Sequence, residues 1–366
     1  MQCGNEGKNF ADSEFFANFA LRKSNLKHHT AMSDTLSPLC LYRLDDGNGL
    51  QAIITNLGCR IMRLEVDGTD VVQGFDRPED YLPENHLSDF GAVIGRYANR
   101  LAGGRIAIDW DVIQLPQNNG PNCLHGGPRG WQYSVYDVVE ATQNRIELAL
   151  VSPDGDNGFP GTVNVRVVYR LEDNALRIDY HAETDSPTVI NMTNHSYFNL
   201  SGNLSSPILD HLLTIDADRY SPTNKVAIPL RNHEPVEGTP FDFRKAKTIG
   251  RDINNENPQL EIGRGYDHNY VLNHPGLEHP SAILESQTSG IRMEVLTTAP
   301  GLQLYTGNYL DGVCGKRGAS YPMRSAVCLE TQQYPDSPNR SWPESTGRLL
   351  PGRPFESTTI FRFSRQ

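Results

Sequence analysis

The stretch Asn191–Asn199 (NMTNHSYFN) places His195 among several other hydrogen-bonding side chains, directly after the apolar run Pro187–Ile190. A hydrophobic core does not require such a density of polar groups, whereas a site that binds a polyhydroxylated ligand does. Histidine exchanges protons near neutral pH, so it could pass a proton to that ligand. Taken alone, the segment is also compatible with a half-buried structural histidine at a strand end. His195 is therefore a candidate proton donor whose role depends on partners elsewhere in the chain.

A second candidate for proton transfer is Glu330, in the apolar, strand-like run Val327–Gln332. Partial burial would raise the pKa of this carboxyl and make it a better base than an exposed glutamate. The alternative is an outward-facing residue of an alternating strand. Together, a histidine and a desolvated glutamate could serve as an acid and a base.

Three further motifs supply side chains that could bind hydroxyl groups. His125 is followed by two glycines that allow close backbone approach to a ligand, and the alternative is an ordinary glycine turn. Asn99 precedes Arg100, whose fork of donors suits hydroxyls or carboxylates, although a surface salt bridge is the commoner use of one arginine. Asp267 lies in the polar stretch Gly265–Asn269, which could bind hydroxyls or form a turn before a strand.

Several other chemistries lack their usual sequence signals. Gly91 and Gly95 do not form a dinucleotide-binding fingerprint. No GxSxG motif marks a nucleophilic serine. His125, His195 and His268 are far apart in the sequence, with no HxH or HExxH spacing, so we expect no catalytic metal.

The composition also limits the class of partner. The chain has 366 residues and a formal net charge of −11. Charged residues are mixed without a basic stripe, which argues against nucleic-acid binding and against an anionic membrane surface. No apolar run of about 18 residues predicts a membrane-spanning helix. The six cysteines include no CxxC pair, so we expect reduced thiols in a cytoplasmic protein.

From residue 38 onward the dominant pattern is short and β-like. Val163–Val167 alternates apolar and polar side chains, the period of a half-buried strand. Dipeptides such as Asp67-Gly68 tolerate the positive φ of tight hairpins. Without a long amphipathic helix or strand–helix alternation, the sequence predicts an all-β fold, a large antiparallel β-sandwich. The expected strands are 51–56, 60–66, 133–139, 145–151, 163–171, 176–182, 188–192, 212–217, 282–285, 292–297, 302–306, 326–331 and 358–363, with short helical turns at 81–90 and 244–255.

The first residues of the chain differ from the rest. They contain no continuous apolar segment of the kind that a secretory signal requires. A second methionine, Met32, stands just before the patterned part of the chain. We therefore expect residues 1–34 to be a flexible N-terminal extension, or the start of the protein to have been assigned too early. Residues 35–366 are expected to form a single domain, because no composition shift or internal repeat marks a second one.

Seven motifs occur in an order that resembles the aldose 1-epimerases, also called galactose mutarotases. The resemblance covers about residues 40–365, and each motif alone is a weak signal. The motifs are FGAVIGRYANR (90–100), NCLHGG (122–127), GDNGFPG (155–161), TNHSYFNL (193–200), YDHN (266–269), PGLQLYTGN (300–308) and CLETQ (328–332).

The resemblance implies a galactose mutarotase-like β-sandwich that interconverts the α and β anomers of free aldohexoses such as glucose and galactose, without a metal or organic cofactor. It implies a role for each of seven residues. Glu330 is the general base, His195 the general acid and His125 an assistant at the sugar's oxygens, while Arg100, Asp267 and Gln303 bind hydroxyls and Asn99 supports them.

Two alternatives stay open beside this interpretation, in addition to a lyase or hydrolase of similar sandwich fold, although a hydrolase of that kind would normally need paired carboxylates. One is a hexose-6-phosphate 1-epimerase, which should carry extra basic residues at the mouth of its pocket. The other is a non-catalytic sugar-binding module on the same fold, which would not need a matched acid and base. Beside His195, Asn194 and Ser196 are candidates for orienting the imidazole ring. The sequence leaves the choice between a monomer and a homodimer open.

Overall fold

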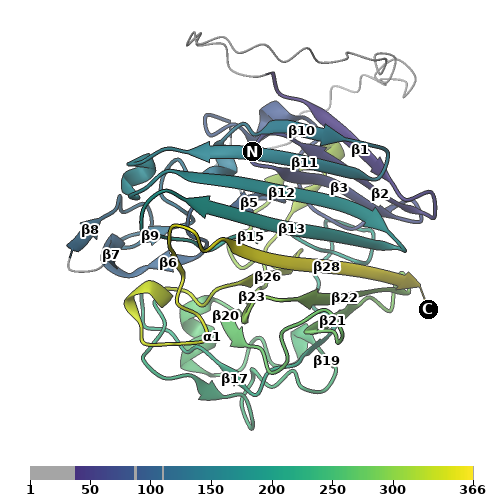
Figure 1. Ribbon diagram of the computed structural model, residues 1–366. Coiled ribbons are helices and arrows are strands. Elements are labelled where there is room, and N and C mark those ends of the chain that lie inside the picture. Colours follow the sequence, from purple (N-terminus) through teal and green to yellow (C-terminus); the bar gives the residue numbers. More distant parts are fainter. Residues whose placement is uncertain (1–37, 86–88, 109–110, 366) are drawn as a thin grey trace. The chain divides into compact units, whose positions relative to one another are not determined.

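The computed structural model describes residues 38–85, 89–108 and 111–365. The expected N-terminal extension, residues 1–34, lies outside these described residues. In the part of the chain that is described, nearly all regular structure is β-strand (Figure 1), and the one α-helix is α1 (Pro258–Gly263). Within those same residues, no helix combines the length and the apolar character needed to cross a membrane.

A nine-stranded antiparallel sheet is the largest sheet of the fold. In spatial order its strands are β10 (Asp137–Ala141), β11 (Arg145–Ser152), β12 (Val163–Glu172), β13 (Ala175–Thr184), β28 (Phe355–Arg365), β22 (Ile291–Thr297), β21 (Ala282–Glu285), β16 (Leu212–Ile215) and β19 (Lys247–Thr248). Figure 1 shows the long strands β11, β12, β13 and β28 side by side. Strand β28, at the C-terminal end of the chain, joins β13 to β22, so this sheet is completed only by the last strand.

The side chains of strand β12 alternate between buried and exposed, as expected for a sheet with one face exposed to solvent. Val163, Val165 and Val167 are buried, while Asn164 and Arg166 between them are exposed. Because successive side chains of a strand point to opposite faces, one face of the sheet meets the core and the other meets water.

Most expected strands are confirmed, with ends that differ by up to three residues. The strand expected at 133–139 is wrong at its start, because η3 (Trp131–Tyr133) is a 3-10 turn and β10 begins only at Asp137. The strand expected at 188–192 is shorter, since β14 (Thr188–Val189) pairs only with β27 (Arg348–Leu349). The short helical turn expected within 244–255 is confirmed by η5 (Ile249–Arg251), whereas η1 (Pro78–Tyr81) ends where the turn expected at 81–90 would begin.

Two smaller antiparallel sheets complete the sandwich. The four-stranded sheet contains β1 (Leu41–Asp45), β2 (Leu50–Thr55), β3 (Arg60–Val66) and β4 (Thr69–Asp70). The five-stranded sheet contains β18 (Glu234–Pro235), β17 (Arg219–Tyr220), β20 (Asp267–Val271), β23 (Gly301–Tyr305) and β26 (Cys328–Gln332). Leu64, Leu304 and Phe361 come one from each of the three sheets and lie in one hydrophobic core. The expected antiparallel β-sandwich is therefore confirmed.

Short two-stranded pairs connect the sheets and carry residues of interest. Strand β5 (Val93–Ile94) pairs with β15 (Thr193–Asn194), and β6 (Arg100–Leu101) pairs with β9 (Cys123–Leu124). The remaining short elements are β7 (Arg105–Ile108), β8 (Asp111–Gln114), β24 (Val313–Cys314), β25 (Ser320–Tyr321), η2 (Ala102–Gly104), η4 (Asp156–Gly158), η6 (Lys316–Gly318) and η7 (Ser337–Asn339).

Candidate active site

One face of the five-stranded sheet is polar. Across β20, β23 and β26, Asn269 lies opposite Gln303, and Gln303 lies opposite Glu330. Directly opposed residues share a face, as do residues two apart along a strand, so Asp267 lies on this face too. The intervening residues belong to the hydrophobic core: Leu302, Leu304 and Leu329.

Backbone hydrogen bonds place His195 opposite this face. The His195 N–H donates to the Ala92 carbonyl at 2.8 Å, and the His195 carbonyl accepts from the Gly91 N–H at 3.0 Å. Asn194 Nδ2 donates to the Gly91 carbonyl at 2.9 Å, and Ser196 Oγ donates to Asn194 Oδ1 at 2.6 Å. Asn194 and Ser196 thus hold the backbone around His195. The expectation that they orient its ring is wrong.

Glu330 and His195 meet although 135 residues separate them in the sequence. Nε2 of His195 lies 3.6 Å from Oε1 of Glu330, and the two residues are 4 % and 2 % exposed. Burial raises the pKa of Glu330 to about 7, with His195 opposing the shift and Asp267 adding to it. A carboxyl with that pKa can both accept and return a proton near neutral pH.

His125 lies beside His195, with ring centroids 5.3 Å apart. The backbone N–H of His125 donates to the Asn99 carbonyl at 3.1 Å. The backbone N–H of Asn99 donates to the ring nitrogen Nδ1 of His125 at 3.2 Å. Since Nδ1 accepts this bond, the proton of the neutral ring is assigned to Nε2. Burial lowers the pKa of His125 to about 3, so the ring is neutral at physiological pH and Nε2–H is a donor.

The glycines after His125 serve the packing of the chain. His125 and Gly126 have φ angles of 52° and 78°. A Cβ on Gly126 would lie 2.0 Å from the carbonyl oxygen of Gly95, so only glycine fits there. The close approach expected toward a ligand is instead an approach to the chain's own backbone.

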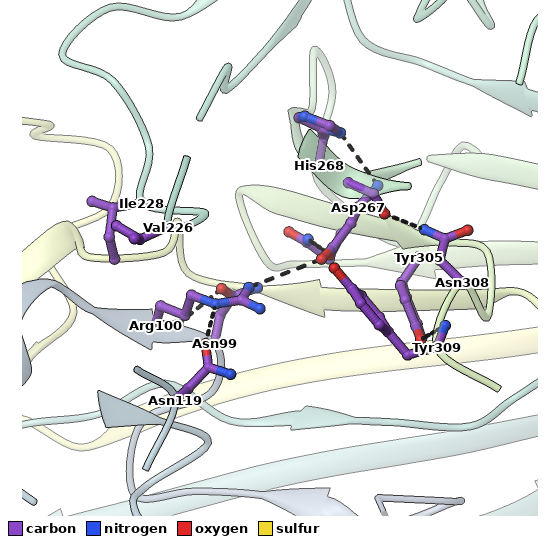
Figure 2. A network of polar contacts seen from close by, with 12 residues as sticks. Asn99, Arg100, Asn119, Val226, Ile228, Asp267, His268, Tyr305, Asn308 and Tyr309 are labelled. Carbon is purple, nitrogen blue, oxygen red and sulfur yellow. Dashed lines mark hydrogen bonds and ion pairs between the residues drawn. The ribbon is translucent and has the colours of Figure 1, made fainter. Parts of the chain in front are cut away.

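Arg100 and Asp267 form a partly buried pair (Figure 2). Nη1 of Arg100 lies 4.0 Å from Oδ2 of Asp267, and Nε of Arg100 donates to Asn119 Oδ1 at 2.9 Å. Oδ1 of Asp267 accepts from Gln303 Nε2 at 2.6 Å. The side chains of Arg100 and Asp267 are only 14 % and 12 % exposed, so this is not an ordinary surface salt bridge. Donors and acceptors fixed in this way suit a ligand rich in hydroxyl groups.

The predicted site residues gather around one cavity of about 520 Å³, a size typical of small-molecule sites. Six of them line it: Asn99, Arg100, His125, His195, Asp267 and Glu330. Gln303 lines a smaller neighbouring cavity that shares Asn99, Arg100 and Asp267 with the first. The structure therefore brings all seven together, with Gln303 behind Asp267.

The polar stretch around Asp267 is divided by the pleat of β20. Asp267 and Asn269 lie on the polar face, whereas His268 between them is 1 % exposed and lies on the other. Nε2 of His268 is 3.1 Å from Gln259 Oε1, and its Nδ1 accepts from the Asp267 N–H at 3.2 Å. His268 is thus a fully partnered structural histidine, and the expectation of a continuous hydroxyl-binding stretch is wrong.

The sequence interpretation missed several residues of the cavity wall. The Tyr197 ring stacks on His195 with centroids 5.0 Å apart and an interplanar angle of 13°, and Tyr305 stands edge-on to His195 at 6.2 Å. Tyr197 follows His195 by two positions, and Tyr305 follows Gln303 by two. Residues two apart on an extended chain point to the same side, so this spacing could have identified both tyrosines from the sequence. Asp89 also lines the cavity, and no motif marks it.

Asp89, His125 and His195 form the one metal-type cluster found among the described residues, with one potential ligand atom of each within 4.8 Å of the others. His125 does not fit a metal ion. Its Nδ1 already accepts from Asn99, and its Nε2 carries the proton, so neither nitrogen offers a free lone pair. The cluster is better suited to hold and transfer protons.

The family comparison agrees with this geometry. The family model described as aldose 1-epimerase matches residues 41–362. The chain belongs to the aldose 1-epimerase family. All seven motifs that carried the resemblance lie inside the matched region of this family.

Similar proteins with known names support the family at the level of the whole chain. The galactose mutarotases of Bos taurus and Homo sapiens are each 42 % identical over 322 residues, covering 86 % of this chain and 91 % of theirs. The aldose 1-epimerase of Escherichia coli strain K12 is 36 % identical over 346 residues, covering 92 % of this chain and 99 % of its own.

Solved structures of aldose 1-epimerase relatives share the fold. An aldose epimerase homologue from C. elegans has a TM-score of 0.80 at 27 % identity, covering 90 % of this chain and 99 % of that chain. The galactose 1-epimerase of Lactobacillus acidophilus has a TM-score of 0.79 at 30 % identity, covering 92 % and 97 %. The galactose mutarotase-like fold expected from the sequence is therefore confirmed.

Proposed function

We propose that this protein is an aldose 1-epimerase that interconverts the α and β anomers of free aldohexoses such as glucose and galactose. The observation that carries the proposal is the buried pair of His195 Nε2 and Glu330 Oε1, 3.6 Å apart on the wall of one cavity. The two oxygens of a cyclic hemiacetal are bonded to the same carbon, C1. A base and an acid placed side by side can therefore address both oxygens at once.

Glu330 and His195 divide the proton transfers in this mechanism. Glu330 removes the proton of the C1 hydroxyl while His195 donates a proton to the ring oxygen, so the C1–O5 bond breaks and C1 becomes an aldehyde. Rotation about C1–C2 presents the other face of the carbonyl. On closure His195 takes its proton back from the C5 hydroxyl, and Glu330 returns the other to the new C1 hydroxyl. Acid–base assistance of this kind typically contributes about 10²–10⁴-fold.

The remaining site residues bind and orient the sugar in this proposal. Arg100, Asp267 and Gln303 offer donors and acceptors for the sugar's hydroxyl groups, and these are fixed by the Arg100–Asp267 ion pair and by the hydrogen bond from Gln303 to Asp267. His125 assists at the sugar's oxygens through its Nε2–H, and Asn99 supports it by donating to Nδ1. Holding the sugar against the acid and the base adds a positional contribution to the rate.

The charges of the cavity favour a neutral sugar over a sugar phosphate. Three carboxylates line it, from Asp89, Asp267 and Glu330, against the two cations Arg100 and Lys225. A hexose-6-phosphate 1-epimerase would need an excess of positive charge at this surface. A non-catalytic sugar-binding module would need no matched acid and base, and the buried His195–Glu330 pair argues against it.

We further propose that the protein acts in the cytoplasm, as a monomer or homodimer, with a small aldose as its partner. The net charge of −11 without a basic stripe supports the absence of nucleic-acid and membrane partners.

Polarimetry on freshly dissolved α-D-glucose and α-D-galactose tests the proposed reaction. We expect the protein to bring the optical rotation to equilibrium much faster than buffer alone, without added metal or cofactor. Glucose 6-phosphate serves as the matched comparison, and we expect a lower kcat/KM for it. Rates equal to those of buffer on both free sugars would contradict the epimerase proposal, and a preference for the phosphate would favour the first alternative.

A further inference from the structure

Asp89 is attached to the same turn that holds His195. The Asp89 carbonyl accepts from the Ala92 N–H at 3.0 Å, and the Ala92 carbonyl accepts from the His195 N–H at 2.8 Å. Gly91, between them in sequence, donates its N–H to the His195 carbonyl. The backbone of Asp89 is therefore fixed relative to the backbone of His195.

The carboxylate of Asp89 and the ring of His195 each keep an unused polar atom. Oδ1 of Asp89 and Nδ1 of His195 are both buried, and neither has a hydrogen-bond partner among the described residues. A potential ligand atom of Asp89 lies within 4.8 Å of a ring nitrogen of His195 and of His125. A buried polar atom without a partner destabilises the fold, so this arrangement needs a compensating role.

We propose that Asp89 is a positioning residue of the catalytic cavity, whose carboxylate faces His125 and His195 and holds the proton of His195 ready for the sugar's ring oxygen. This inference rests on the proposed epimerase function and adds a third carboxylate to its site.

A metal ion is the other use of such a cluster, and the hydrogen bond from Asn99 to His125 argues against it. With its proton on Nε2, His125 presents a donor to the cavity, and a carboxylate is the natural acceptor for a donor at that position. Asp89 therefore places a negative charge beside the two rings, although its Oδ1 makes no hydrogen bond to Nδ1 of His195. In serine hydrolases a carboxylate is hydrogen-bonded to the histidine ring and stabilises its charged form. We infer that Asp89 supports the charged form of His195 through proximity of charge.

Electrostatics give Asp89 a second effect, on the base. A negative charge within about 4–6 Å of an ionisable group stabilises its positive form and destabilises its negative form. The charge of Asp89 accordingly adds to the rise in the pKa of Glu330 and opposes the fall in the pKa of His125. The titratable and charged groups that line the cavity with His195 are Asp89, Arg100, His125, Tyr197, Lys225, Asp267, Tyr305, Tyr309 and Glu330.

Asp89→Asn tests the proposal, because it keeps the shape and removes the charge. At neutral pH we expect kcat to fall about tenfold or more with little change in KM, because the charged form of His195 loses the carboxylate that stabilises it. The lower limb of the pH–rate profile should move to lower pH, because Glu330 loses a neighbouring negative charge. In the free protein, NMR should show changed ring-nitrogen chemical shifts for His195, because its ring loses a neighbouring carboxylate.

Two further variants separate this role from simpler ones. Asp137→Asn, at an exposed position of β10, removes the same charge outside the cavity and should leave both the pH–rate profile and the ring-nitrogen chemical shifts of His195 unchanged. Asp89→Glu keeps the charge and should restore part of the rate. If Asp89→Asn reacts like the wild type and gives the same His195 chemical shifts, or if neither Asp89 variant folds, the positioning role is overturned.

The NMR measurement keeps the two proposals distinguishable. A wild-type protein without epimerase activity would contradict the proposed function, while the His195 chemical shifts in Asp89→Asn would still decide whether the carboxylate acts on that ring.

Discussion

The nine-stranded sheet and the five-stranded sheet use the same alternation of side chains for opposite purposes. In β12 the polar residues between buried valines, Asn164 and Arg166, are exposed to water. In β26 and β23 the polar residues Glu330 and Gln303 are as inaccessible as the leucines beside them. The difference is what covers the polar face. The cavity wall that carries His195 covers the polar face of the five-stranded sheet. The polar residues of that face are therefore shielded from water, which shifts the pKa of Glu330 toward neutral pH.

Removing the acid or the base should have the largest effect. We expect Glu330→Gln and His195→Asn each to lower the rate of mutarotation by at least about 10²-fold, because each removes one of two coupled proton transfers. Thermal unfolding should show both variants folded. The measurement is polarimetry with freshly dissolved α-D-glucose.

His268→Asn is the matched control among buried histidines. It removes a ring that is fully partnered on the opposite side of β20, so we expect a loss of stability of about 1–3 kcal/mol with kcat of the folded protein unchanged. A rate loss equal to that of His195→Asn would contradict the division of roles between the two faces.

Core truncations in the two sheets should cost similar stability and differ in activity. Leu329→Ala in β26 and Leu148→Ala in β11 each remove a buried leucine side chain, with an expected loss of about 2–5 kcal/mol in urea unfolding. Only Leu329→Ala should also lower kcat, because the cavity that it leaves next to Glu330 lets the carboxyl group of this base move out of position. Equal kcat in both variants would mean that the packing behind the site does not position it.

The buried charge of Glu330 should weaken the fold at high pH. Its pKa of about 7 in the folded protein lies above the ordinary value of 4.5, so the folded state holds a proton that the unfolded state releases between these values. Stability from this group is full below pH 4.5 and declines as pH rises to 7.

The side chain of the Glu330→Gln variant cannot ionise. At pH 8 its free energy of unfolding should therefore exceed that of the wild type by up to about 3 kcal/mol, and the difference should vanish near pH 4.5. Urea unfolding at the two pH values measures this. In the wild type, kcat/KM should rise as pH increases through about 7, because the same ionisation creates the base. A pH-independent stability difference would argue that Glu330 is not desolvated as the structure has it.

A change in the binding network should have the smallest effect. Arg100→Lys loses the bond from Nε to Asn119 and the fixed fork beside Asp267, so we expect KM to rise about tenfold with a smaller change in kcat. Arg105→Lys, at an exposed position of β7, is the control and should leave KM unchanged. Equal effects would show that the network does not contact the sugar.

The amino-acid sequence by itself determined the fold class and the family of this protein. Short alternating runs such as Val163–Val167 predict strands because the period of two follows from local backbone geometry. The dipeptide Asp67-Gly68 predicts a hairpin for a local reason as well, and both residues have positive φ between β3 and β4. The order of seven motifs identified the family from residues 90 to 332.

Only the tertiary structure decided which polar residues meet and which lose water. Local pattern could not distinguish His195 from His268, since both lie in polar stretches and only the family resemblance gave His195 a role. In the structure one faces Glu330 and the other Gln259. The sequence held no sign of Asp89, whose role depends on a turn that brings it to two histidines from distant motifs. Burial and through-space charge set the pKa of Glu330, and both arise from contacts between segments that the sequence keeps far apart.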